Sequence, residues 1–244
     1  MTVRFNSEGA MRVLIVVSAL AALSVEGCGK KSGEEPSGKT TAAETAAQVD
    51  PSAAFLELAS RHASAALHEA PEMATSLGVA EDIAGEDYNA RLGDYGFESN
   101  QRARAMNEQF LQELKQVDRS ALSGTAAITY DVLKTSYEFG ARRNQFEFGG
   151  ATAWGYASPY IVTQLSGPHI FLLRLLQTQH PIDSKENIEA YLTRLSEFGR
   201  VFDEVSEMIG ADAALGVVPP YFAIDGAINT IAGVTAPAPA DNPL

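Results

Sequence analysis

The sequence contains a single cysteine, Cys28, among 244 residues. One cysteine excludes an intrachain disulfide and a metal site built from several thiolates. Long apolar runs are also missing: the longest, Val13 to Leu23, has ~11 residues, whereas a membrane-spanning helix needs about 20. Basic residues are few, with 18 Lys and Arg against 31 Asp and Glu, and the net charge of −13 repels phosphate backbones. We therefore expect no nucleic-acid partner.

The common sequence signatures of catalysis are lacking as well. The chain has no Gly-rich phosphate loop, no Gly-x-Ser-x-Gly elbow and no calcium-binding loop. The stretch His68–Glu72 (HEAPE) differs from the zinc motif HExxH in its last residue, and Pro71 interrupts the helix on which that motif depends. We therefore interpret His68 as a solvated residue near a helix end.

The other histidines and the acidic clusters have equally simple structural interpretations. His62 falls on a helix face, His169 in the first turn of a helix, and His180 before a proline that stops one. Acidic residues cluster at 81–87 and 203–207, where we expect a solvated loop and the outer face of a helix. The sequence therefore indicates no catalytic pair, and we assign no catalytic and no metal-binding residue.

The first 27 residues have the pattern of a lipoprotein signal peptide. Arg12 precedes the apolar run Val13 to Leu23, which has the length of a signal peptide's hydrophobic region. Gly27 and Cys28 follow, and a small residue before a cysteine resembles the site that lipoprotein signal peptidase cuts, although Glu26 departs from that pattern. We expect cleavage before Cys28 and a lipid on Cys28 that anchors the protein to a membrane. The alternatives are an ordinary secretory signal and a buried helix followed by a free thiol.

Residues 28–50 are expected to form a flexible tether. They contain no aromatic residue and a single valine, so they cannot bury enough apolar surface to offset the entropy lost on ordering. Gly29, rather than Asp, follows the cysteine, which by resemblance to Gram-negative lipoproteins favours the outer membrane. We therefore expect the protein in the cell envelope, at the periplasmic face of the outer membrane.

Residues 51–236 predict an all-α domain, a multi-helix array. Asp50-Pro51 begins the first helix, because an aspartate cap accepts free amide protons and proline is preset for the first turn. Pro71 ends or bends this helix. A loop is expected over 79–97, and Ser99 is expected to cap the second helix.

The middle of the domain combines helices with one irregular segment. A third helix follows a break at 118–123 and places Ile128, Val132 and Phe139 on one face. Residues 147–166 are rich in glycine and aromatic residues and are expected to be extended or irregular. Gly167-Pro168 then opens a short, apolar and buried helix that ends before Pro181.

Two further helices are predicted at the C-terminal end. Asp183 and Glu186 form a capping-box pattern that starts the longest helix, with Phe202 in the middle of its apolar stripe. A turn at 216–220 leads to the last helix, whose apolar residues are Phe222, Ile224, Ile228 and Ile231. Residues 237–244 read as a Pro/Ala-rich linker.

Several short stretches, taken in order, resemble the bacterial family called domain of unknown function 885. They are 71–78, the break 117–123 followed by Tyr130-Asp131, 167–168, 179–183, 191–195, 216–220 and 241–244. No single stretch is specific, but the ordered set covers the chain from Phe55 to Leu244.

The resemblance implies a helical, zincin-like fold, distantly similar to carboxypeptidase Taq-type metallopeptidases. It also implies that family members continue beyond Leu244 into a C-terminal half that carries an HExxH-type zinc site. No residue of that motif has a counterpart here, so no catalytic residue is carried over. We expect this chain to be the N-terminal helical portion of a zinc metallopeptidase-like hydrolase, inactive alone, with zinc and a peptide substrate belonging to the full-length protein. The alternative is a non-catalytic envelope binding or scaffold lipoprotein.

Overall fold

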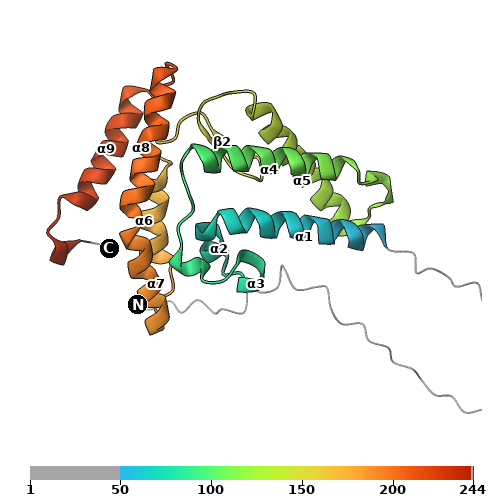
Figure 1. The fold of residues 1–244 in the computed structure, drawn as a ribbon, viewed down its shortest axis with the longest axis horizontal. Coiled ribbons are helices and arrows are strands. Elements are labelled where there is room, and N and C mark those ends of the chain that lie inside the picture. The colour runs from blue at the N-terminus through green and yellow to red at the C-terminus, as the bar shows by residue number, and fades with distance from the viewer. Residues whose placement is uncertain (1–49, 243) are drawn as a thin grey trace, which may run out of the picture. The chain divides into compact units, whose positions relative to one another are not determined.

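Helices dominate the part of the chain that the computed structural model describes, residues 50–242 and 244. The longer helices are α1 (Pro51–Glu69), α2 (Pro71–Leu77), α4 (Phe97–Lys115), α5 (Gly124–Arg143), α6 (Pro168–Thr178), α7 (Lys185–Ser196), α8 (Phe198–Ala214) and α9 (Tyr221–Thr235). The all-α class predicted from the sequence is confirmed (Figure 1). Within the described residues, no helix combines the length and the apolar content that crossing a membrane requires.

Proline and aspartate fix the first helix boundaries as the sequence predicts. The Asp50 carboxylate accepts a hydrogen bond from the Ser52 amide at 3.0 Å, and Pro51 occupies the first helical position. Pro71 ends α1 and is itself the first residue of α2. Gly78 then closes α2 with a φ of 61°, a left-handed conformation that a residue without a Cβ adopts without strain.

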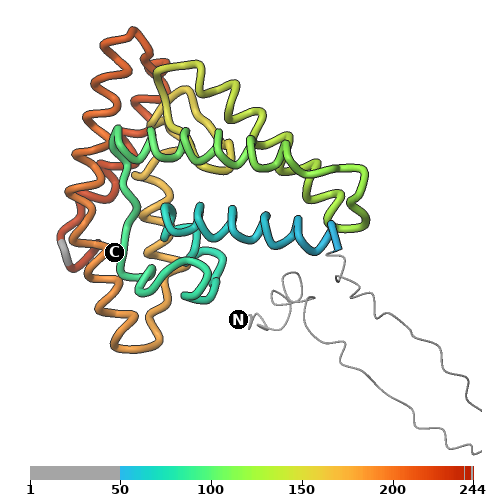
Figure 2. Tube along the Cα trace, turned by 45° about the vertical axis from the view of Figure 1, so that its right-hand side comes forward, coloured from blue at the N-terminus to red at the C-terminus, as the bar shows by residue number. Residues whose placement is uncertain are grey.

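The first core lies between α1, α4 and α5, which Figures 1 and 2 show as neighbouring helices. Aromatic residues from all three helices fill it, and the half-buried Trp154 packs against it from the segment after α5. The buried aromatic members are Phe55, Phe110, Tyr130 and Tyr137. The side chains of this core hold together segments that lie up to about a hundred residues apart in sequence.

The segment between α5 and α6 is mostly irregular, as predicted. It contains β1 (Gly150–Ala151) and β2 (Ala157–Ser158), a two-residue antiparallel pair with Gly150 opposite Ser158. Beyond it, α6 and α8 meet in a second core of Leu92, Leu172, Val201 and Val205.

Three predicted boundaries differ from the structure. The expected loop at 79–97 contains two short helices, α3 (Glu81–Ala84) and the 3-10 helix η2 (Tyr88–Ala90). Both are held by a small hydrophobic core, in which Ala84 and Tyr88 pack with Leu67 and Ala74. The second helix begins at Phe97 with Gly96 as its cap, and the Ser99 hydroxyl bonds back to the Gly96 carbonyl.

The predicted longest helix is in fact two helices. Ser184, not Asp183, caps α7 by accepting from the Asn187 amide at 3.1 Å, and the chain is interrupted at Glu197 before α8 begins. The buried face of α8 is Val201, Val205 and Met208, so Phe202 is only half-buried. The buried residues of α8 therefore differ from the apolar stripe predicted for one continuous helix.

Two helix faces that are apolar in sequence point toward solvent. On α5, the aligned residues Ile128, Val132 and Phe139 are exposed. On α9, the buried residues are Ala223 and Ala227, and the larger apolar side chains lie outside. The small residues of this helix therefore face the core, and its large apolar residues do not. After α9 the chain forms the 3-10 helix η4 (Pro239–Asp241). The side-chain amide of Asn242 donates to the Val234 carbonyl at 2.9 Å.

Candidate functional site

The most extensive polar arrangement in the described residues surrounds the connecting segment 91–96, which joins η2 to α4. Its backbone is bound by side chains from three helices. Arg194 of α7 donates to the Arg91 carbonyl at 2.8 Å, and Glu72 of α2 accepts from the Gly93 amide at 2.8 Å. Glu204 of α8 accepts from the Tyr95 amide, two residues further along the segment, at 2.7 Å.

Arg194 is the centre of this arrangement. Its side chain has no exposed surface and also donates to the carbonyls of Tyr88 at 2.8 Å and Pro71 at 3.3 Å. Burial lowers the pKa of Arg194 to about 10, and the negative charge of Glu72 opposes that shift. The guanidinium therefore stays charged at neutral pH and binds three backbone oxygens from segments far from α7 in sequence.

Glu72 and Tyr95 form the second part of the arrangement. The Tyr95 hydroxyl donates to the same Glu72 oxygen that accepts from Gly93, at 3.0 Å. Burial and the nearby Glu72 carboxylate raise the pKa of Tyr95 well above its ordinary value, so the phenol keeps its proton. Glu72 thus acts as a fixed acceptor for two donors of the connecting segment.

Arg200 attaches α8 to the same segment. Its guanidinium pairs with Glu197 at 2.8 Å and Glu204 at 2.9 Å, and reaches Asp94 at 3.2 Å. Burial acts to lower the pKa of Arg200, but the two helix carboxylates outweigh it and the net shift is upward. The expectation that Glu204 is simply solvated is therefore wrong, since this residue binds both Arg200 and the Tyr95 amide.

Family-like stretches that are distant in sequence meet around η2. From the stretch 71–78, the Thr75 hydroxyl donates to the Asn89 side chain at 2.7 Å. His180, from the stretch 179–183, lies with Nε2 at 3.0 Å from the Asn89 carbonyl. Arg194, from the stretch 191–195, binds the carbonyl of Tyr88. These stretches therefore form one structural unit with η2 at its centre.

His62 belongs to a separate buried network in the first core. Its Nδ1 lies 3.2 Å from the Tyr137 hydroxyl and its Nε2 lies 3.1 Å from Glu113, while the ring stacks on Phe110. Burial lowers the pKa of His62, and the hydrogen bond to Glu113 only partly offsets that effect. A neutral imidazole that donates to Glu113 and accepts from Tyr137 satisfies both nitrogens, which confirms the interpretation of a satisfied helix-face histidine.

The remaining histidines lie apart from each other. His68 is exposed near the end of α1, as predicted. His169 lies in the first turn of α6, as predicted, and is buried with no hydrogen-bond partner at either ring nitrogen. Burial lowers the pKa of His169. The imidazole nitrogens of His180 both face backbone carbonyls, those of Pro181 and Asn89.

The donor set of the described residues does not fit a zinc centre. Within residues 50–242 and 244, no three side chains of His, Cys, Asp or Glu are grouped so that they could hold a metal ion. The side chains of the HEAPE stretch do not converge on one point. His68 lies against Gly85, Glu69 pairs with Arg102 at 3.1 Å, and Glu72 binds the connecting segment.

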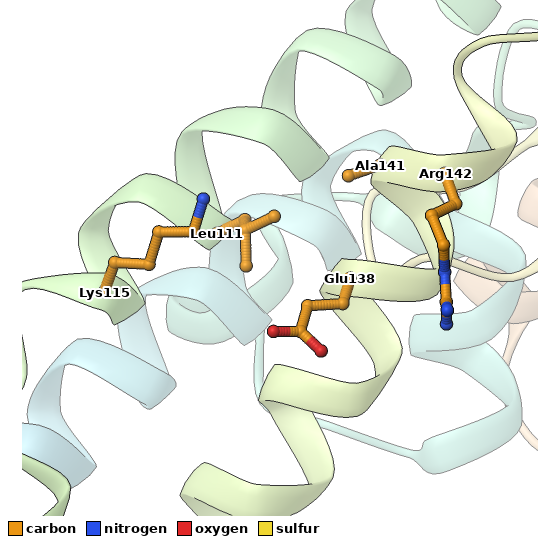
Figure 3. A pocket seen from close by; sticks show the side chains of 5 residues that line it. All are labelled: Leu111, Lys115, Glu138, Ala141 and Arg142. Carbon is orange, nitrogen blue, oxygen red and sulfur yellow. The ribbon is translucent and has the colours of Figure 1, made fainter.

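A surface depression of about 300 Å³ lies between α4 and α5. Figure 3 shows Leu111 and Lys115 on α4 facing Glu138, Ala141 and Arg142 on α5. The side chains of Glu138 and Arg142 point in different directions, so their charged groups do not converge on one point. This depression offers no arrangement suited to acid–base chemistry.

Sequence reasoning assigned only one site residue, and it missed the buried ones. Cys28 lies outside the described residues, so its lipidation stays a prediction. Arg194 and Glu72 carried no sequence signal of burial, because charged residues on helices are ordinarily solvated. Their occurrence inside the family-like stretches was the one available indication, and Tyr95, in the expected loop, had none.

Comparison with known proteins identifies the family. The family model described as "Bacterial protein of unknown function (DUF885)" matches residues 71–244. A crystal structure described as "the putative lipoprotein from Colwellia psychrerythraea" has a similar fold, with a TM-score of 0.71 and 22% sequence identity over 80% of this chain. The match covers 33% of that protein, so this chain spans about a third of its length. No curated protein matches the chain. Because the family model covers well over half of the sequence, the chain belongs to the DUF885 family of bacterial proteins.

Proposed function

We propose that this chain supplies the N-terminal helical portion of a lipid-anchored zinc metallopeptidase-like hydrolase of the cell envelope, and that it is inactive alone. One observation carries the proposal: the chain belongs to DUF885 over residues 71–244 yet spans only about a third of a solved protein with the same fold. The groups that perform chemistry would then belong to the rest of the domain, together with the zinc and the peptide substrate.

The side chains of Arg194, Arg200 and Glu72, called the arginine network below, give this portion a structural role. Arg194, Arg200 and Glu72 bind the connecting segment through its backbone, so they hold α2, α7 and α8 in fixed positions relative to α4. Catalysis requires reacting groups to be held in place by a rigid surround. A helical array fixed in this way is suited to form one wall of a substrate cleft.

Metal analysis and a peptidase assay on the purified 244-residue chain test this role. We expect no stoichiometric zinc and no peptide hydrolysis, with or without added zinc. Tightly held zinc at one ion per chain, lost when any of the four histidines is replaced, would show that the chain has its own metal centre and would overturn the proposal.

The second candidate is a non-catalytic envelope binding or scaffold protein. The observation that favours it is the absence of a converging catalytic group among residues 50–242 and 244. The nucleotide sequence after codon 244 separates the two. An HExxH-type helix encoded there supports the hydrolase, and an unrelated sequence after a stop codon supports the scaffold.

A further inference from the structure

The outward face of α9 differs from an ordinary solvated helix surface. Tyr221 and Ile228 are 78% and 57% exposed, and Ile224 and Ile231 lie on the same stripe at helical spacing. Asp225 is the only charged residue of α9. Helices that remain in water normally carry charged side chains on their outer face. An apolar surface of this kind indicates an interaction site.

The inward face of α9 fixes this orientation. Ala223 and Ala227 are buried, and Gly226 lies so close to Gln164 that an added Cβ would meet the Gln164 Cβ at 2.4 Å. Only small residues fit at this contact, and the side of α9 that carries Ile224 and Ile228 is too large to take their place. The helix therefore cannot rotate to bury its large side chains against the described part of the chain.

An apolar groove runs beside the exposed face, between α8 and α9. Its volume is about 210 Å³, and branched aliphatic side chains line most of it: Ile209, Val218, Ile224, Ile228 and Ile231. The only charged lining residue is Asp212, which is buried and accepts a hydrogen bond from the Gly149 amide at 3.0 Å. With its carboxylate already engaged, the groove is shaped to receive apolar side chains from a protein surface.

We infer that the α9 face, defined here as the outward side chains of α9 with the adjoining groove, is the surface on which the rest of a DUF885 domain packs. The inference rests on the proposed function. The family match runs through α9 to residue 244, so α9 is part of the family domain and not an addition to it. The solved relative in fold has about three times the matched length, so a protein of that length has enough further chain to cover this face.

Two other occupants fit the observations less well. A membrane surface rich in anionic lipid is disfavoured by the net charge of −13 and by Asp225 on the helix itself. A second copy of this chain would leave unexplained where the remaining two-thirds of a protein of the neighbour's length pack. The rest of the domain accounts for both the apolar face and the length difference.

The apolar line on α5 offers a matched control. Val132 is 61% exposed, close to the 57% of Ile228, but three of the four residues one helical turn away from it are polar, Thr129, Thr135 and Ser136. A narrow apolar line beside hydroxyl side chains is compatible with a solvated surface. The two sites therefore compare an exposed aliphatic residue on the proposed interface with an equally exposed one elsewhere.

Site-specific photo-cross-linking tests the inference in the chain as its bacterium makes it. The probe p-benzoylphenylalanine replaces Ile228 in one strain and Val132 in another, and cross-linked peptides are sequenced by mass spectrometry. We expect the probe at 228 to capture a peptide that matches DUF885 outside the region covered by residues 71–244, and the probe at 132 not to do so. In the probe-228 chain, Ile231→Glu should lower the yield roughly tenfold or more, because it places an unpaired charge in the interface, while the far-UV circular dichroism stays unchanged.

Several results would overturn the inference: a cross-link to a second copy of residues 50–244, to lipid or to a protein outside the family, equal capture from both probe positions, or no cross-link. The readout is independent of the proposed hydrolase role. A captured DUF885 segment whose complex contains no zinc would leave the α9 interface standing and count against the metallopeptidase. Zinc held by the chain alone would overturn the proposed function without affecting the cross-link.

Discussion

Replacing Arg194 with methionine tests most directly whether the buried arginine network stabilises the fold. Methionine is unbranched and flexible enough to fill the buried space, but it donates no hydrogen bond. The substitution removes the donor to the Arg91 carbonyl at 2.8 Å and the donors to the carbonyls of Tyr88 and Pro71. Hydrogen bonds from charged groups contribute about 1.5–3 kcal/mol each, so three such bonds set the upper limit of the effect.

The surrounding contacts reduce that limit. The Tyr88 carbonyl keeps a bond from the Arg91 amide at 3.2 Å, and the Pro71 carbonyl keeps one from the Thr75 hydroxyl at 3.1 Å. The Arg91 carbonyl loses its arginine donor, and buried Glu72 loses the positive charge nearby. We therefore expect Arg194→Met to lower the free energy of unfolding by about 3–5 kcal/mol, the range for breaking a buried charged interaction.

Urea unfolding of the full chain, followed by circular dichroism at 222 nm, measures this loss. Arg174→Met is the control, because Arg174 is an exposed arginine on α6 and its replacement should change stability by about 0.5 kcal/mol or less. Arg194→Lys keeps the charge but loses the forked donor geometry, so its loss should fall between the two. A loss below about 1 kcal/mol for Arg194→Met would refute the reasoning that this network holds the connecting segment.

Three further predictions concern the anchor, the core and the pH dependence of stability. Cys28→Ala should abolish incorporation of a labelled fatty acid, and labelling of the variant would show that the lipid is elsewhere. Leu172→Ala should lower the free energy of unfolding, measured in urea, by about 2–5 kcal/mol. Phe202→Ala should lower it by less than the 3–5 kcal/mol typical of a buried phenylalanine, because Phe202 is only half-buried. A larger loss for Phe202→Ala than for Leu172→Ala would contradict the packing of α8. Burial lowers the pKa of His62 in the folded chain, so as the pH falls the unfolded chain binds a proton at this residue first. The contribution of neutral His62 to stability is therefore present above pH ~6.5, the ordinary histidine pKa, and is lost as the pH falls below that value. Stability measured between pH 7 and pH 5 should fall less in His62→Gln than in the unmodified chain, and equal slopes would contradict this assignment.

Helix type and several boundaries were predictable because their causes are local. The Asp50 carboxylate caps the helix that follows it directly, and Pro71 breaks the helix in which it occurs. Both effects depend on residues within one turn of the boundary. The boundary at Glu197 was not predictable in the same way, since no proline marks it, Gly199 lies inside the helix that follows, and the apolar pattern continues through it.

The buried face of a helix depends on the rest of the molecule, and here the sequence pattern misleads. In α9 the largest apolar residues form a regular stripe, which predicts a core-facing side. The helix instead contacts its neighbours through Ala223, Gly226 and Ala227, because Gln164 leaves no room for larger groups. A pattern of this kind shows that a face is apolar but not which surface covers it.

The buried arginine shows the opposite error, a residue that the pattern places outside. Arg194 lies on an amphipathic helix among solvated neighbours, and nothing in residues 185–196 distinguishes it. Its burial depends on carbonyls of Pro71, Tyr88 and Arg91, about a hundred or more residues earlier in the chain. Only the folded arrangement brings these oxygens to one point, so the network could not be derived from local spacing.

The position of this network also explains what the family-like stretches represent in this part of the chain. Three of them, 71–78, 179–183 and 191–195, contribute contacts around η2, through Thr75, His180 and Arg194. In each case the contact satisfies a buried polar group, which costs free energy when left unpaired. Similarity at these positions therefore reflects the requirements of the helical array rather than of a reaction. The α9 face takes no part in these contacts, and its exposed apolar side chains are available to a second protein surface.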